Sequence, residues 1–166
     1  MTAKLAAVLK TAKGLGALNV RPLPAKAVAV ADWVRWRCRY GCGRYGRRLT
    51  CPPAAPGPEE TRRLLAGYRS AVLVRARVCR DIRRIVPALE RELFLAGYYK
   101  VFGFAAGACN LCRTCAASCR HPELARPSME ACGIDVFATV RKAGLPIGVL
   151  KDKTCEADCY GLLLVE

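Results

Sequence analysis

The most informative stretch of the chain is Gly107-Ala-Cys109-Asn-Leu-Cys112-Arg-Thr-Cys115-Ala-Ala-Ser-Cys119. Its cysteines follow the spacing Cys-x2-Cys-x2-Cys-x3-Cys, which is typical of segments that bind a [4Fe–4S] cubane. Closely spaced thiolates reach irons at neighbouring corners of a cubane, while backbone N–H groups turn toward the cluster sulfides. We therefore predict an iron–sulfur site in the loop 107–122, with the surrounding polypeptide folded about it.

A second group of cysteines lies upstream and has the form Cys38-x3-Cys42-x8-Cys51. Glycines and prolines surround these residues, so we predict a loop over 35–58 whose conformation depends on a bound metal. Three cysteines leave a four-ligand site one ligand short. One or two clusters are therefore possible, depending on how the remaining cysteines are shared.

Two ways of sharing the ligands stay open. In bacterial ferredoxins the fourth cysteine of such a run binds a different cluster and is followed directly by proline, whereas Arg120 and His121 come before Pro122 here. If Cys119 crosses to the upstream trio, the other three cysteines of the run need a ligand from Cys132, Cys155 or Cys159. Alternatively, the trio stands alone, and one iron lacks a protein ligand and is open to a substrate.

The other candidate ligands are less well defined by the pattern. Cys132 is either a ligand or a small apolar core residue. Cys155 and Cys159 form a ligand pair, a redox dithiol or neither. Cys79 has no cysteine nearby in the sequence, so we expect it to be inert. The single histidine, His121, is a polar loop residue, a ligand or a hydrogen-bond donor to a cluster.

Zinc is the alternative metal. A structural zinc ion takes four ligands in a tetrahedron, with zinc–sulfur distances of about 2.3 Å. Such sites more often pair two short cysteine hooks from separate segments, whereas one loop of this chain carries four sulfurs within eleven residues. The spacing therefore favours iron and sulfide over zinc.

Composition limits the class of protein. The 166 residues contain 28 Lys and Arg, 13 Asp and Glu and eleven Cys, for a formal net charge of +15. This length fits one domain, 1–166, and no apolar run approaches the ~20 residues of a membrane span. The N-terminus lacks the apolar core of a secretory signal, so we expect a cytoplasmic protein whose thiols stay reduced.

The remaining pattern predicts an α/β (α+β) fold. It consists of a small four-stranded sheet backed by two main helices, with the cysteine loops at one edge. We expect helices over 3–13, from 58 onward, over 82–97 and over 136–143 with Asp135 as N-cap. The expected strands are 71–78, with one face in solvent, and 99–105, 147–150 and 160–165.

The chain resembles a family of small prokaryotic predicted metal-binding proteins, domain of unknown function 2284. The resemblance rests on Cys38-x3-Cys42-x2-Tyr45-Gly46, on Cys51-Pro52-Pro53, on the 109–119 run and on Arg126-Pro-Ser-Met-Glu-Ala-Cys-Gly-Ile-Asp-Val136. It implies metal binding, with iron–sulfur as the expected chemistry and the two cysteine groups as the sites. It implies no reaction, and it does not extend to Cys155 and Cys159.

Three functions compete on this basis. We favour a [4Fe–4S] protein that passes electrons to or from a larger redox enzyme, because no acid–base constellation is evident. The second is an enzyme that uses an open iron for reductive or sulfur-handling chemistry, and the third is a zinc-stabilised RNA-binding module. Arginines in the two loops favour an acidic redox protein as partner and RNA as the second choice, with no membrane or DNA binding. They are Arg39, Arg44, Arg47, Arg48, Arg113 and Arg120.

Overall fold

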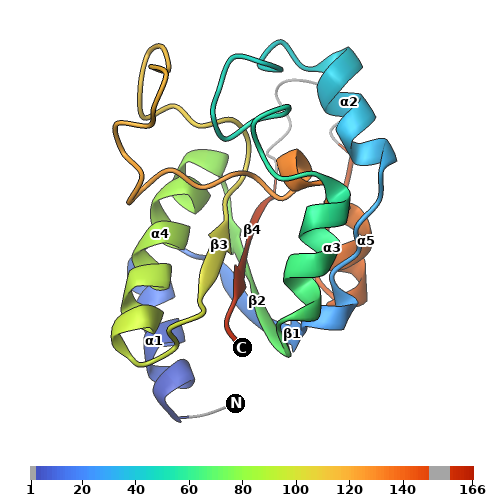
Figure 1. Ribbon diagram of the computed structural model, residues 1–166. Helices are drawn as coiled ribbons and strands as arrows, with labels where there is room; N and C mark the ends of the chain where they lie inside the picture. The colour runs from blue at the N-terminus through green and yellow to red at the C-terminus, as the bar shows by residue number, and fades with distance from the viewer. Residues whose placement is uncertain (1–2, 150–157) are drawn as a thin grey trace.

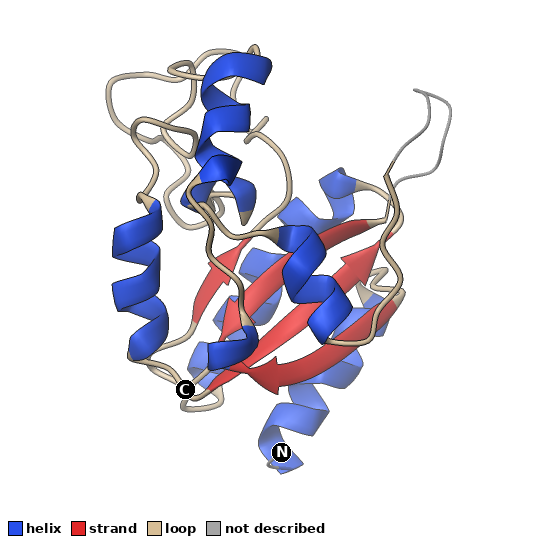
Figure 2. Cartoon of the chain, turned by 90° about the vertical axis from the view of Figure 1, so that its right-hand side faces the viewer, coloured by secondary structure: helices blue, strands red, loops and turns tan. Residues whose placement is uncertain are grey.

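The computed structural model describes residues 3–149 and 158–166, which form a four-stranded sheet with helices on both faces (Figures 1 and 2). The strand order is β1-β2-β4-β3, and every neighbouring pair is antiparallel. The strands are β1 (Asn19–Pro24), β2 (Ser70–Ala76), β3 (Phe102–Phe104) and β4 (Cys159–Leu164). The predicted α+β class is therefore confirmed. No helix in the described residues has the length and apolar character needed to span a membrane.

The core has two layers, one on each face of the sheet. On one face, α1 (Ala3–Gly14) and α4 (Cys79–Leu95) pack against side chains of β2 such as Val72 and Val74. On the other, α3 (Pro58–Ala66) and α5 (Val136–Lys142) pack over Leu73 and Leu162. The expectation of a solvent face on 71–78 is wrong at Ala71 and Leu73, which this second layer covers, whereas Arg75 is partly exposed and Arg77 is exposed.

Helix ends were well predicted. Pro58 occupies the first turn of α3, and the Glu60 side chain accepts a hydrogen bond of 2.7 Å from the Gly57 N–H. At α5, Asp135 Oδ1 accepts a hydrogen bond of 2.9 Å from the Ala138 N–H, which confirms Asp135 as the N-cap. Gly144 follows the helix with a φ of +69°, a conformation that glycine adopts without strain.

Three elements differ from the prediction. The edge strand β1 was missed because Pro22 and Pro24 weaken its strand signal, although proline is tolerated at a sheet edge. The strand expected over 147–150 is absent from 147–149, and position 150 lies outside the described residues. Helix α2 (Trp33–Gly41) replaces the beginning of the predicted loop, because residues 33–40 contain neither glycine nor proline.

The cysteine-bearing segments gather at one end of the sheet, away from both termini (Figure 1). The segment 42–57 follows α2, and the segment 105–128 follows β3 and leads into the 3-10 turn η2 (Glu130–Cys132). Isolated bridges join Val30 to Ile134 and Ala105 to Ser128. The second bridge closes the segment 105–128 at its base, and the first joins the stretch before α2 to the stretch after η2.

A disulfide bond joins Cys79 to Cys159. These are the first residues of α4 and β4, and they lie 80 positions apart in the sequence. The expectation that Cys79 has no partner is therefore wrong. The spacing of the cysteines in the sequence did not predict this disulfide. Cys79 follows the end of β2 closely, and the sheet topology brings the start of β4, with Cys159, beside that end.

Gly161 tests the packing of β4 against α4. A Cβ atom at this position would lie 2.6 Å from Val86 Cγ2 and 2.7 Å from Ile82 Cγ2. We expect Gly161→Ala to lower the free energy of unfolding by about 1–3 kcal/mol, the usual cost of an overpacked core. Urea denaturation measures this change. Gly148→Ala is the control because nothing lies within 4 Å of that site, and equal losses in both variants would contradict the packing.

Candidate metal centre

All four cysteines of the 107–122 loop line one small cavity. Cys109, Cys112 and Cys115 are half-buried, and Cys119 is exposed. Leu49 and Thr50, from the segment after α2, line the same cavity together with His121. The structure therefore keeps Cys119 with the other three cysteines of its run and brings the two cysteine segments into contact.

Arg48 links the two segments. Its Nη1 donates a hydrogen bond of 2.9 Å to the Cys112 carbonyl, and its Nη2 donates one of 3.0 Å to the Arg113 carbonyl. Nη1 also lies 4.0 Å from Cys115 Sγ. The buried Nε atom has no hydrogen-bond partner among residues 3–149 and 158–166. Arg48 thus holds the run and keeps one buried donor unused.

The environment of Cys115 favours its thiolate. The Leu49 N–H donates a hydrogen bond to the sulfur, and Arg48 adds a second hydrogen bond and a positive charge. Together these interactions lower the pKa of Cys115 below its ordinary value of 9.0. Donors directed at a ligand sulfur also tune the potential of an iron–sulfur cluster. The local chemistry of this site therefore fits a negatively charged metal–thiolate group.

Both ends of the run are anchored on α4. At its start, Arg83 donates from Nη1 to the Ala106 carbonyl at 3.0 Å and from Nε to Asn110 Oδ1 at 3.1 Å. At its end, Arg126 pairs with Glu90 through two contacts of 2.6 and 2.7 Å. The hydrogen bond to Glu90 raises the pKa of the Arg126 guanidinium. These anchors hold a loop that lacks regular secondary structure.

The upstream trio lies in one region of the fold, without the close grouping that would hold one metal ion. Cys38 lies in α2, Cys42 follows that helix directly, and Cys51 is buried. Burial, and then the nearby Cys42, raises the pKa of both Cys38 and Cys51. Cys38 and Cys109 add to the effect on Cys51. Cys51 therefore lies close to its own trio and to the first cysteine of the run.

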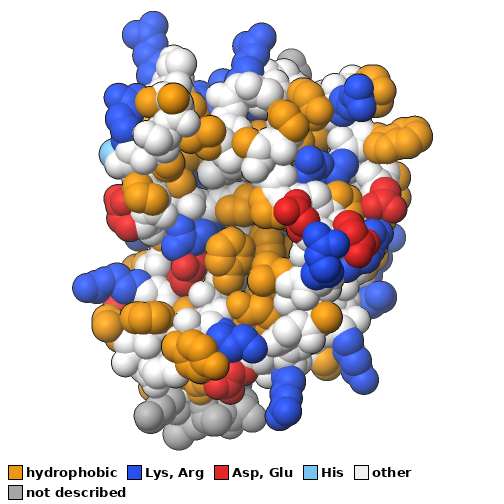
Figure 3. Space-filling view, viewed as in Figure 1, with side chains coloured by type: hydrophobic (Ala, Val, Ile, Leu, Met, Phe, Trp, Pro, Cys, Tyr) orange, Lys and Arg blue, Asp and Glu red, His pale blue; other side chains and the backbone are white. Residues whose placement is uncertain are grey.

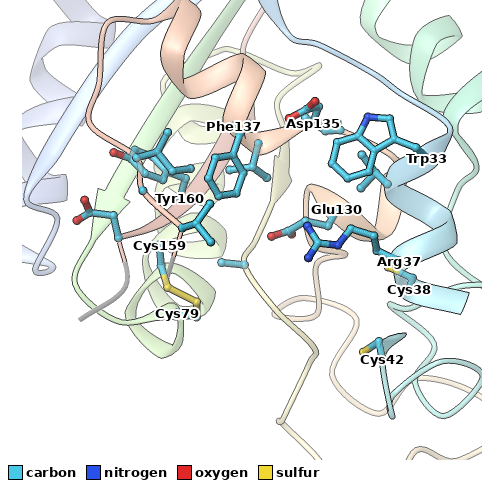
Figure 4. Close-up of a pocket in the computed structure, with 18 residues that line it drawn as sticks. Trp33, Arg37, Cys38, Cys42, Cys79, Glu130, Asp135, Phe137, Cys159 and Tyr160 are labelled. Carbon is cyan, nitrogen blue, oxygen red and sulfur yellow. A yellow bond between two sulfur atoms is a disulfide. The ribbon is translucent and has the colours of Figure 1, made fainter. Parts of the chain in front are cut away.

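A cavity of about 790 Å³ opens beside Cys38 and Cys42 (Figure 4). Its volume lies in the ~300–1,000 Å³ range of small-molecule sites. Arg37 and Glu130 supply charged groups in its wall. Desolvation raises the pKa of the Glu130 carboxyl. Two of the predicted trio, Cys38 and Cys42, thus face a space large enough for a ligand.

The other predicted ligands have different surroundings. Cys132 is fully buried in the apolar core beside Met129 and Ile134, and this burial raises its pKa to about 12. The Cys159 sulfur is bonded to Cys79 and is therefore not a free thiol in this structure. Cys155 lies outside the described residues. Among the residues that are described, no three Cys, His, Asp or Glu side chains are grouped to hold one metal ion.

The residues that position the thiols could not be predicted from the sequence. Arg48 was counted as surface charge, whereas it binds two carbonyls inside the site. Arg35 was not singled out, yet its Nη1 donates to the carbonyls of Pro56 and Ala131, both at 2.7 Å. Nothing in the sequence distinguishes these arginines from the many exposed ones. Their roles depend on carbonyls far away along the chain.

Comparison with known protein families gives a match that covers most of the chain. The family described as "Predicted metal-binding protein (DUF2284)" matches residues 21–165, a region that includes both cysteine groups. Neither a curated protein nor a solved structure matches the chain.

The two cysteine groups are expected to titrate differently in reduced, metal-free protein. The thiolate is the species that reacts, so alkylation accelerates as the pH rises through the pKa. We expect the midpoint for Cys115 below pH 9.0 and that for Cys51 above it. Iodoacetamide labelling followed by peptide mass spectrometry measures both.

Arg48→Ala is expected to move the Cys115 midpoint upward, because it removes a hydrogen bond and a positive charge. Arg47→Ala, at the exposed neighbouring position, is the matched control and leaves the midpoint unchanged. The same shift in both variants would show that general surface charge, and not the Arg48 contact, sets the pKa.

The pair between Glu90 and Arg126 is expected to stabilise the fold. Glu90→Gln leaves the Arg126 cation largely buried without its carboxylate, so the free energy of unfolding falls by about 1–3 kcal/mol. Glu59→Gln is the control because its pairs with Arg62 and Arg63 are exposed, and it costs less than about 1 kcal/mol. Urea denaturation compares the two variants, and equal effects would contradict the anchoring role.

Proposed function

Since the chain belongs to the DUF2284 family of predicted metal-binding proteins, we propose that it binds [4Fe–4S] clusters and passes electrons to or from a larger redox enzyme. The observation that carries this proposal is the cavity shared by all four cysteines of the 107–122 loop. Their spacing is one that binds a cubane. A bound cluster would supply one-electron redox chemistry at this end of the sheet.

The first cluster is assigned to Cys109, Cys112, Cys115 and Cys119. A cubane with four thiolates carries a net negative charge, and such a group needs hydrogen-bond donors when it is shielded from water. The Leu49 N–H already points at Cys115, and Arg48 Nε is a buried donor without a partner among the described residues. These two donors support an anionic group at this position.

The second centre is assigned to Cys38, Cys42 and Cys51. In this assignment Cys119 stays with its run, and Cys132 remains a core residue because it is enclosed by apolar side chains. The influence of Cys109 on the pKa of Cys51 supports two centres that lie close together. Adjacent centres suit a protein that moves electrons from one surface to another.

An acidic redox protein is the proposed partner. Exposed arginines surround both cysteine segments, and Figure 3 shows basic side chains projecting from the end of the molecule where these segments lie. They are Arg37, Arg39, Arg44, Arg47, Arg113 and Arg120. A positive field of this kind accelerates encounter with an acidic protein, and added salt weakens it. We place this exchange in the cytoplasm, where thiols stay reduced.

A second candidate function is favoured by the large cavity. Cys38 and Cys42 line it, and with Cys51 from outside the cavity the trio would supply three thiolates for a cubane that has four irons. An iron without a protein ligand binds exogenous groups, so a substrate in this cavity would meet a reactive metal site. Under this alternative the protein is an enzyme for reductive or sulfur-handling chemistry.

Metal analysis after anaerobic purification tests the proposal. We expect iron and acid-labile sulfide in equal amounts, and a visible absorption band that bleaches reversibly on reduction. Cys115→Ser and Cys51→Ser should each lose one of two separable spectral components. Cys132→Ala, which changes a core residue, should keep the full iron content. Zinc without sulfide, especially with salt-dependent RNA binding, would instead establish the zinc-stabilised module.

A further inference from the structure

The cavity of about 790 Å³ has an apolar wall that no described part of the chain fills. Val34 and Ile134 line it and are buried in the protein, and the rings of Trp33 and Phe137 line it as well. Trp33 remains 49% exposed, which is a large fraction for an apolar ring beside a cavity. A ligand with an apolar body would therefore gain free energy by removing this wall from water.

Four charged side chains also line the cavity, and two of them have partners within the protein. Asp135 caps helix α5, and Asp158 pairs with Arg75 at 2.8 Å. The other two are Arg37 and Glu130, and neither forms an ion pair within residues 3–149 and 158–166. The cavity thus presents one positive and one negative side chain without an opposite charge beside it.

Arg37 and Glu130 enter the cavity from different elements, α2 and η2. Figure 4 shows both side chains in the space between the Cys79–Cys159 disulfide and the two free thiols. A guanidinium group binds a carboxylate through paired N–H donors, and a carboxylate accepts hydrogen bonds from an ammonium group. The two side chains together can therefore satisfy a ligand that carries both charges.

From this arrangement we infer that the cavity binds a zwitterion with an apolar or aromatic body, which is the chemistry of a hydrophobic amino acid. Arg37 binds the carboxylate of the ligand, Glu130 binds its ammonium group, and the apolar body lies against Trp33 and Phe137. A ligand with only one charge would leave either Arg37 or Glu130 without a counter-charge. Neither contact involves a cysteine, so the inference goes beyond the proposed function and holds whether or not a metal is bound.

Short contacts hold the two charged residues in place relative to each other. Arg35, in the same helix as Arg37, donates a hydrogen bond of 2.7 Å to the carbonyl of Ala131, the neighbour of Glu130. The Ala31 N–H donates one of 2.9 Å to the Gly133 carbonyl. These bonds join α2 to η2 before any ligand arrives. A site fixed in this way loses little conformational freedom on binding.

Three ligands of nearly the same shape test the inference on the unchanged full-length protein. L-Phenylalanine carries both charges, 2-phenylethylamine lacks the carboxylate, and 3-phenylpropanoate lacks the ammonium group. Isothermal titration calorimetry measures the affinity of each. We expect L-phenylalanine to bind about tenfold to a hundredfold more tightly than either analogue, because each analogue lacks one hydrogen-bonded charge.

Variants of the two charged residues assign each contact. Arg37→Gln should weaken L-phenylalanine by a similar factor and leave 2-phenylethylamine unweakened, since that ligand has no carboxylate. Glu130→Gln should weaken L-phenylalanine and leave 3-phenylpropanoate unweakened. The matched controls are Arg39→Gln and Glu123→Gln, which change exposed residues outside the cavity wall and should leave all three affinities unchanged.

Tryptophan fluorescence locates the ligand. Trp33 and Trp36 are the two tryptophans of the chain, and only Trp33 lines the cavity among the residues that define its wall. In the Trp36→Phe variant, L-phenylalanine should therefore change the emission of Trp33.

Three results would overturn the inference: no binding of L-phenylalanine at millimolar concentration, analogues that bind as tightly as L-phenylalanine, or equal losses in Arg37→Gln and Arg39→Gln. The comparison of ligands on the unchanged protein does not depend on any variant folding. Iron and sulfide analysis tests the metal proposal separately, so a cavity that binds none of the three ligands leaves that proposal intact.

Discussion

Strand β4 is buried along its entire length, and this constraint determines where everything else lies. A strand buried on both faces needs an apolar layer on each side, so α4 covers one face while α3, α5 and η2 cover the other. Because the sheet is antiparallel, β2 and β3 end where β4 begins. The segments that leave these strand ends therefore converge at one end of the sheet. The four cysteines of the 109–119 run lie on the segment that leaves β3, whereas Cys38 lies on α2 and Cys42 and Cys51 lie on the segment after that helix.

Arginine side chains hold these segments in place of a backbone ladder. Arg35, Arg48 and Arg83 each donate hydrogen bonds to main-chain carbonyls of segments distant in sequence, and Arg126 binds Glu90 of α4. A guanidinium group has five N–H donors in a fixed plane, so one residue can join two or three chain segments. The high arginine content therefore has two separate roles. One set of arginines holds the cysteine loops together from inside, and another remains exposed around them.

The parts of the fold that depend on local chemistry could be predicted from the sequence. The N-caps of α3 and α5, the amphipathic pattern of α4 and the spacing of the 109–119 run are all properties of neighbouring residues. The parts that depend on tertiary contacts could not. Strand β1 exists because β2 pairs with it, despite its two prolines, and Cys79 meets Cys159 because the sheet places β4 beside β2. The grouping of Cys38, Cys42 and Cys51 is intermediate, because their proximity was expected whereas the helix that carries Cys38 was not.

The same topology gives chemically identical thiols different properties. Metals bind thiolates, so each ligand must first lose a proton, and the cost of this loss depends on its surroundings. Around Cys115, the Leu49 N–H and Arg48 lower the cost of losing the proton. Burial raises this cost for Cys38 and Cys51. Burial also raises the pKa of Cys132 to about 12. In the disulfide, the Cys79 and Cys159 sulfurs have no proton to lose. The cysteine pattern in the sequence could not predict which thiols ionise readily and which do not, because the hydrogen-bond donors and apolar side chains around each sulfur determine its pKa.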